Sequence, residues 1–155
     1  LNPTPLIGIQ IVLNSPGGLT RSVIIYQAGQ ISSSGSPPPL GICNGLPATI
    51  AGTSNSEILN GTSGRDVIVG NGGNDTINGY GGNDTICAGS GNDTINGNGG
   101  RDTIIDTSGD NNVTGGAGND DITTGSGDDV IDGGSGNSDR CDAGAGDNTL
   151  QNCEL

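Results

Sequence analysis

The amino-acid sequence predicts an all-β fold: a parallel β-roll, or β-solenoid, built from nine-residue repeats, with an apolar N-terminal β-hairpin or arm. The first observation is composition, because glycine supplies 32 of the 155 residues, only 29% are hydrophobic, and Phe, Trp and Met are absent. The second is a nine-residue period that runs without interruption through residues 61–132. The third is charge, because all 17 acidic residues lie between Glu57 and Glu154. Such a chain has too few large apolar side chains for a conventional core between two layers.

Residues 1–31 are the first expected element, an apolar β arm or hairpin. Two apolar runs, 6–13 (LIGIQIVL) and 23–26 (VIIY), flank a turn-forming stretch at 14–18, which is the pattern of a two-stranded hairpin. The Ser- and Pro-rich residues 32–42 follow as a linker. The chain starts without Met, so we expect a processed product or a fragment, from which an N-terminal secretion signal has been removed.

Residues 43–155 are the second expected element, in which the repeats are regular over 61–132 and degenerate at both ends. With Gly61 as position 1, eight consecutive repeats place Gly at position 4 and an aliphatic residue at position 8. Position 6 is Asp in seven of the eight repeats and Asn111 in the other. One inserted residue after 132 brings Asp139 and Cys141 into the position-6 and position-8 slots.

Each repeat is interpreted as a turn followed by a short strand. Glycines allow the turn conformations that a Cβ would forbid. In the strand, positions 7 and 9 point outward and position 8 points inward. Two repeats then complete one coil of a parallel solenoid, and about six coils stack at a spacing of roughly 4.8 Å. The position-8 side chains of the two sheets form a thin core.

This thin core predicts that something else stabilises the fold. One aliphatic side chain in nine residues buries too little apolar surface to offset the entropy of ordering the chain. The position-6 carboxylates would also stack above one another, and like charges about 5 Å apart repel by roughly 3 kcal/mol at an effective dielectric of about 20. A hard cation removes this repulsion, and carboxylates together with turn carbonyls suit Ca²⁺ better than a transition metal.

The repeat Gly-Gly-x-Gly-x-Asp-x-aliphatic-x resembles the nonapeptide of the RTX, or haemolysin-type, calcium-binding repeats. The resemblance is strong over 61–132, weaker over 43–60 and 133–151, and absent from 1–42. It implies a β-roll that binds several Ca²⁺ ions between turns two repeats apart and that folds when calcium binds. Carried over by position, the ligands on one edge are Asp66, Asp84, Asp102, Asp120 and Asp139, and those on the other edge are Asp75, Asp93, Asn111 and Asp129, followed by Asp147 or Asn148. Because Asn111 supplies no charge, we expect its layer and the degenerate ends to bind weakly or not at all.

Four cysteines in a secreted chain predict two disulfides. Cys141 and Cys153 lie close together in the sequence, where a disulfide would close the last coil. Cys43 and Cys87 are then left to pair with each other. Free thiols and an intermolecular disulfide are the alternatives.

The outward faces of the two expected sheets differ. At positions 7 and 9, one presents the polar residues Thr76, Asn78, Thr94, Asn96, Asn112 and Thr114, whereas the other includes Val67, Val69, Cys87 and Ile105. Residues 1–31 could cover this apolar face within the same chain. Alternatively, the arm adds to a neighbouring molecule, because a solenoid ends in open strand edges. Head-to-tail contacts of that kind build filaments.

Composition also excludes several function classes. A net charge of −13 opposes binding to nucleic acids and anionic membranes, and no run approaches the roughly 18 apolar residues of a membrane helix. The absence of His and Lys removes most general bases and activated nucleophiles, so we expect no enzyme. The sequence favours a secreted, extracellular or cell-surface calcium-binding structural protein that assembles with copies of itself into filaments or a matrix. The alternatives are a monomeric calcium-binding folding or adhesion module of a secreted enzyme or adhesin, and an ice- or glycan-binding surface.

Overall fold

The computed structural model describes residues 9–14, 20–25, 31–32 and 41–154, and the chain divides into two compact units, Leu1–Pro39 and Leu40–Leu155. The N-terminal unit contains a three-stranded sheet in which β2 (Thr20–Ile25) lies between β1 (Ile9–Asn14) and β3 (Ile31–Ser32). β1 and β2 pair antiparallel, which confirms the predicted hairpin within the described residues. The two-residue strand β3 was not predicted, because it is too short to show a period. Residues 6–8 and Tyr26 of the expected strands lie outside the described residues.

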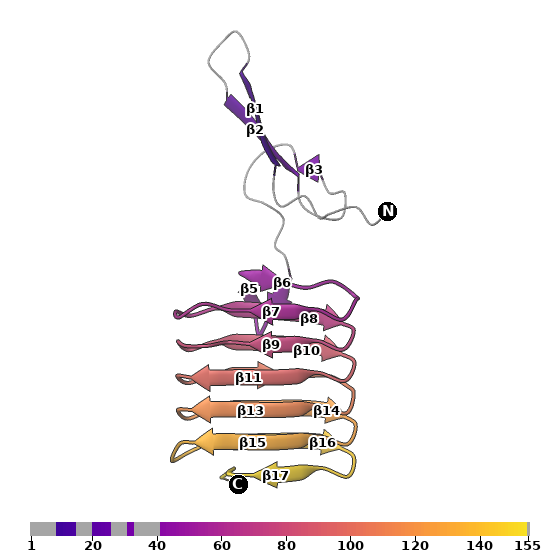
Figure 1. Cartoon of the computed structure of the whole chain (residues 1–155), viewed down its shortest axis with the longest axis vertical. Coiled ribbons are helices and arrows are strands. Elements are labelled where there is room, and N and C mark those ends of the chain that lie inside the picture. The colour runs from indigo at the N-terminus through magenta and orange to yellow at the C-terminus, as the bar shows by residue number, and fades with distance from the viewer. Residues whose placement is uncertain (1–8, 15–19, 26–30, 33–40, 155) are drawn as a thin grey trace. The chain divides into compact units, whose positions relative to one another are not determined.

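The C-terminal unit is a parallel β-solenoid in which the chain alternates between two six-stranded sheets (Figure 1). The strands of the first sheet, in chain order, are β6 (Ile50–Ala51), β8 (Val67–Gly72), β10 (Thr85–Ser90), β12 (Thr103–Ile105), β14 (Asp121–Ser126) and β16 (Arg140–Ala145). The strands of the second sheet are β7 (Ile58–Asn60), β9 (Thr76–Asn78), β11 (Thr94–Gly99), β13 (Asn112–Ala117), β15 (Val130–Ser135) and β17 (Thr149–Gln151). Spatial neighbours are two repeats apart in the chain, as the nine-residue period predicts.

The strand register follows the repeat. Ile86 pairs with Ile68 on one side and with Ile104 on the other, so equivalent positions stack directly. Cys141 pairs with Ile122, which confirms that the residue inserted after 132 is absorbed in the turn before β16. The nine-residue frame therefore holds along the whole roll.

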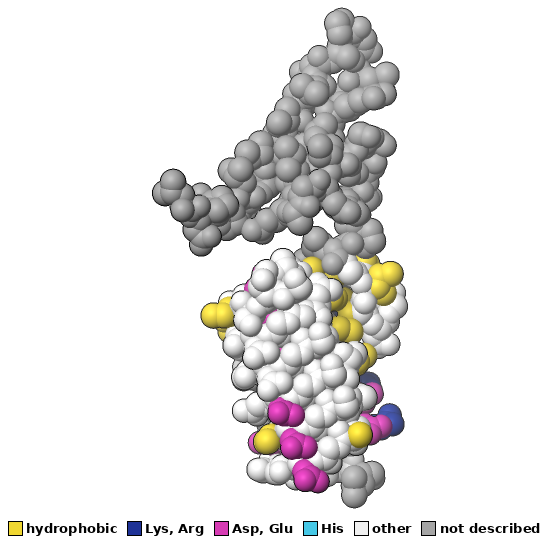
Figure 2. All heavy atoms as spheres, turned by 90° about the vertical axis from the view of Figure 1, so that its right-hand side faces the viewer, with side chains coloured by type: hydrophobic (Ala, Val, Ile, Leu, Met, Phe, Trp, Pro, Cys, Tyr) yellow, Lys and Arg dark blue, Asp and Glu magenta, His cyan; other side chains and the backbone are white. Residues whose placement is uncertain are grey.

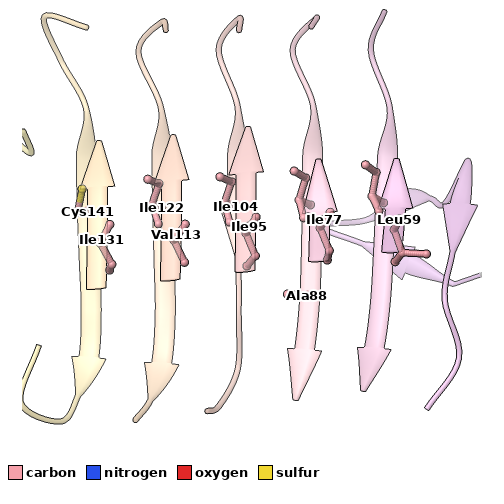
Figure 3. Packing of buried hydrophobic residues seen from close by; sticks show 11 residues of the cluster. Leu59, Ile77, Ala88, Ile95, Ile104, Val113, Ile122, Ile131 and Cys141 are labelled. Carbon is pink, nitrogen blue, oxygen red and sulfur yellow. The ribbon is translucent and has the colours of Figure 1, made fainter. Parts of the chain in front are cut away.

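The position-8 side chains fill the interior between the two sheets. Figure 3 shows them stacked layer on layer, and they are at most 1% exposed at Ile68, Ile77, Ile86, Ile95, Ile104, Val113, Ile122 and Ile131. In the last coil Leu150 is 39% exposed, because no further layer follows it in the described chain. This thin core is the one that the sequence predicts.

Glycine at position 4 lets neighbouring turns approach closely. Gly100 has a φ of +122°, which L side chains rarely adopt, and a Cβ there would lie 1.6 Å from the carbonyl oxygen of Gly82 in the preceding coil. Gly64, at the same position of the first regular repeat, has no such neighbour, because the atom nearest to a Cβ would be 3.8 Å away. Position 4 is thus restricted by stacking rather than by the turn alone.

A short hairpin covers part of the first sheet's outer face. It consists of β4 (Ile42–Cys43) and β5 (Leu46–Pro47), joined through Asn44 and Gly45 at positive φ. Cys43 is fully buried against Val67 and Val69, and Leu46 packs against the same cluster. The cover at these two valines thus comes from Cys43 and Leu46, at the start of the expected roll segment 43–155. A cover supplied by residues 1–31 stays a prediction.

The four cysteines form two disulfides. Cys43–Cys87 links the β4–β5 hairpin to β10 with a Cα–Cα distance of 5.7 Å. Cys141–Cys153 links β16 to the residues after β17, also with a Cα–Cα distance of 5.7 Å. The second disulfide thus lies at the C-terminal end of the stack, whereas the first holds the β4–β5 hairpin to β10, the third strand of the first sheet.

Candidate calcium-binding edges

The position-6 side chains form two columns at the edges of the roll, where the chain turns from one sheet to the other. Turns that lead into the first sheet carry Asp66, Asp84, Asp102, Asp120 and Asp139, which we name the first edge. Turns that lead into the second sheet carry Asp75, Asp93, Asn111, Asp129 and Asn148, which we name the second edge. The nine position-6 residues that the sequence singles out are all buried, at 0–5% exposure. Asn148, rather than Asp147, continues the second edge, because its Oδ1 accepts the Asp129 N–H at 2.8 Å.

Each column is a ladder of hydrogen bonds between coils. The Oδ1 atom of Asp84 accepts the backbone N–H of Asp66 at 2.8 Å, and Oδ1 of Asp102 accepts the N–H of Asp84 at 2.8 Å. The same bond, with N···O distances of 2.7–3.0 Å, repeats through the other layers of both edges. Each position-6 side chain after Asp66 therefore satisfies a turn amide of the preceding coil, which sequence reasoning missed because it treated these residues as ligands alone.

The second carboxylate oxygen has no hydrogen-bond partner in six layers. It is the buried Oδ2 atom of Asp75, Asp84, Asp93, Asp102, Asp120 and Asp129. Burying a charged oxygen without a partner is costly, and a hard cation would satisfy its lone pairs. Within residues 41–154, no three acidic or other metal-binding side chains converge on one point, so an ion would take its remaining ligands from backbone carbonyls. Such an oxygen-only donor set suits Ca²⁺.

Burial also changes the acidity of these carboxyls. It raises the pKa of Asp102 to about 7; the hydrogen bond to Asp84 opposes this rise, and the charges of Asp120 and Asp84 add to it. Burial likewise raises the pKa of Asp75, Asp84, Asp93 and Asp120 above the usual value. In a metal-free roll, ionising these buried carboxyls is thus less favourable than ionising a carboxyl in water.

The acidic groups of the first coils are satisfied within their own repeats. Oδ2 of Asp66 accepts the backbone N–H of Thr62 at 2.6 Å and the Thr62 hydroxyl at 2.9 Å. Glu57 accepts the backbone N–H of Thr53 at 2.5 Å and the Thr53 hydroxyl at 3.1 Å. Thr at position 2 thus supplies the donors that the six other carboxylates lack.

At the C-terminal end, Glu154 continues the first edge. Its carboxylate accepts the backbone N–H of Asp139, and its own N–H donates to the Asp139 carbonyl at 2.6 Å. Sequence reasoning missed Glu154, because this residue lies beyond the last residue that the nine-residue frame reaches.

Position 5 forms a second, more exposed ladder. Asn83 Oδ1 accepts the N–H of Arg101 at 2.9 Å, one coil later. On the second edge, Asp110 and Asp128 accept the N–H groups of Asp128 and Asp147, both at 2.9 Å. Figure 2 faces this edge, and acidic side chains gather over its lower part. The Asn-Asp pair at positions 5 and 6 of four regular repeats was the sequence signal for this ladder.

The comparisons with known proteins agree with the geometry of the edges. The family model described as RTX calcium-binding nonapeptide repeat (4 copies) matches residues 51–86, 81–105 and 105–139. No curated protein and no solved structure matches the chain significantly. The described residues contain no long apolar helix of the kind that crosses a bilayer. With more than half of its residues matched and with the repeat's roll observed, the chain belongs to the family of RTX calcium-binding nonapeptide repeats.

Proposed function

We propose that the chain is an extracellular structural protein whose roll folds on binding several Ca²⁺ ions and which assembles with copies of itself through its N-terminal arm. The observation that carries the calcium part is the set of six buried carboxylate oxygens without partners along the two edges. Bound calcium would supply the positive charge that the ladders lack. The residues proposed to hold it are Asp75, Asp84, Asp93, Asp102, Asp120 and Asp129, and at the ends Asp66 and Asp139.

The ladder explains how the chain prepares these carboxylates. Because Oδ1 of Asp102 is held by the Asp84 amide, its Oδ2 is left free for a ligand. The amide bond fixes the carboxylate before an ion arrives, so less side-chain entropy is lost on binding. Folding and calcium binding are therefore one coupled equilibrium, in which the binding free energy of the ions offsets the cost of burying the carboxylates.

The extracellular location is supported by the two disulfides. Cys43–Cys87 and Cys141–Cys153 are structural bonds of the kind that persist in oxidising compartments. Calcium is also abundant outside cells, where sites of modest affinity remain filled.

Self-assembly is supported by open strand edges in both units. β1 pairs only with β2 in the described part of the chain, and three terminal strands of the roll, β6 and β7 at one end and β17 at the other, each pair with one named strand. On β7, Ile58 is 71% exposed. Since Cys43 and Leu46 already cover Val67 and Val69, these valines do not need the arm, which leaves β1 for a neighbour.

Two measurements test the two parts of the proposal. Calorimetric titration of the chelated chain with Ca²⁺ should show several bound ions and a gain of β signal in circular dichroism; no binding would refute the calcium part. Sedimentation velocity in Ca²⁺ should show large species that disperse with chelator. Val12→Pro, which places a residue without an N–H in β1, should abolish these species, while Ser34→Pro in the expected linker should not.

A second candidate is a monomeric calcium-binding module that supports the folding of a larger secreted enzyme or adhesin. It is favoured by the separate compactness of Leu40–Leu155, which contains both edges. A calcium-loaded chain that sediments as a compact monomer would support this candidate and refute the assembly part.

A further inference from the structure

Asn111 gives the second edge one layer that differs from all the others. Asn111 is 2% exposed, and its Oδ1 accepts the N–H of Asp93 at 2.8 Å, as an Asp does in other layers. Its second atom is Nδ2 instead of an unpartnered oxygen. Nδ2 donates to three oxygens: Asp106 Oδ2 at 2.8 Å, the Gly109 carbonyl at 2.8 Å and Asp129 Oδ1 at 3.0 Å. An amide nitrogen therefore gathers two carboxylates and a carbonyl around it.

Asp106 makes this arrangement specific to one repeat. Position 1 of the regular repeats is Gly, Ala or Thr except at Asp106, and position 6 is Asp except at Asn111. Repeat 106–114 has thus moved its carboxylate from position 6 to position 1. Asp106 is 3% exposed, and its Oδ1 accepts the Gly89 N–H at 3.1 Å, so both of its oxygens have partners.

We infer that the Asn111 amide group takes the place of a calcium ion in this layer, so that Asp106 and Asn111 form a metal-free clamp in the middle of the second edge. The amide N–H groups supply the positive dipole that an ion would supply elsewhere, and they contact the oxygens directly. Asn111 also removes one negative charge from between Asp93 and Asp129, which lie one coil away on either side. The layer consequently needs no cation.

This inference rests on the proposed function, because it assumes that other layers bind calcium. The clamp separates the Asp75 and Asp93 layers from the Asp129 layer on the second edge. No such interruption exists on the first edge, where Asp84, Asp102 and Asp120 follow one another. The second edge therefore holds two groups of ions. The hydrogen bonds of the Asp106–Asn111 clamp persist at calcium concentrations too low to fill the other layers.

The test counts bound ions in the full chain by equilibrium dialysis against ⁴⁵Ca²⁺. The double variant Asp106→Gly/Asn111→Asp restores the usual residues of positions 1 and 6, and it should bind one ion more than the wild type. The matched control is Asp102→Asn, which places an amide at position 6 of the first edge, where position 1 is Gly97 and cannot complete a clamp. It should bind at least one ion fewer.

Equal numbers of ions in the double variant and the wild type would overturn the clamp. Absence of binding in every chain would instead refute the proposed function, so the two failures are distinguishable. A second measurement needs no variant: in calcium-loaded wild type, the side-chain NH₂ protons of Asn111 should exchange at least about tenfold more slowly than those of the exposed Asn119. Exchange as fast as that of Asn119 would also overturn the clamp.

Discussion

Replacing Asp102 by Asn should change the stability of the roll in opposite directions with and without calcium. Asp102 is fully buried at the centre of the first edge. The amide of Asn can keep the Oδ1 acceptor for the Asp84 N–H, which is 2.8 Å away, so the substitution removes charge and little else. Its neighbours Asp84 and Asp120 lie one coil away on either side.

The expected magnitudes follow from these contacts. At a coil spacing of roughly 4.8 Å, each neighbouring carboxylate repels Asp102 by up to about 3 kcal/mol at an effective dielectric of about 20. Salt and solvent at the edge screen part of this, so Asp102→Asn should raise the free energy of unfolding by about 1–3 kcal/mol in chelator. With Ca²⁺ at about a hundred times its Kd, losing one ion should lower the free energy of unfolding by about 2.7 kcal/mol.

Urea unfolding followed by far-UV circular dichroism, in Ca²⁺ and in chelator, measures both effects. The matched control is Asp110→Asn, which makes the same charge change at the exposed position 5 and keeps the acceptor for the Asp128 N–H. The control should stay within about 0.5 kcal/mol of wild type in both buffers. A change of the same sign in both buffers for Asp102→Asn would refute the reasoning.

Two further predictions concern pH and glycine. Because the folded-state pKa of Asp102 is raised to about 7, and those of Asp75, Asp84, Asp93 and Asp120 are also raised, the folded chain binds protons more tightly than the unfolded chain. In calcium-free buffer the urea midpoint should therefore rise as the pH falls from above 7 toward 4, and a steady fall would contradict the burial of these groups. Gly100→Ala, which faces Gly82 and has a positive φ, should lower the stability of the calcium-loaded roll by about 2–4 kcal/mol. Gly64→Ala should change it by less than about 1 kcal/mol, and equal thermal midpoints for the two variants would show that coil stacking does not limit position 4.

The repeat frame made most of the fold predictable. A strict nine-residue period with aliphatic residues such as Ile86 and Ile95 at position 8 places these side chains on the same face of every strand, so the core and both edges follow from the register. The β4–β5 hairpin could not be found in this way, because two-residue strands carry no period. Its burial of Cys43 depends on tertiary contact with Val67.

The candidate edges were predictable in position but not in detail. Asp66 and Asp84 occupy the same place in the repeat, yet only Asp66 finds donors at Thr62, a difference that rests on one side chain at a variable turn position. Asn111 was predicted to weaken its layer because it lacks charge. Its partner Asp106 was overlooked because position 1 had been treated as part of the turn.

The position-6 ladder gives the roll a direction along its axis. Each coil contributes a buried N–H whose acceptor belongs to the coil that follows in the chain, as Asp66 depends on Asp84. Removing coils from the C-terminal end therefore leaves buried position-6 amides without acceptors, at about 1–3 kcal/mol each. Removal from the N-terminal end instead leaves position-6 carboxylate lone pairs, which solvent or cations can reach, and exposed position-5 N–H groups such as that of Arg101. During synthesis, the position-6 N–H of the newest coil has no acceptor until the following coil has been made. The N–H groups of Asp129 and Asp139 thus gain their acceptors only when Asn148 and Glu154 have been made.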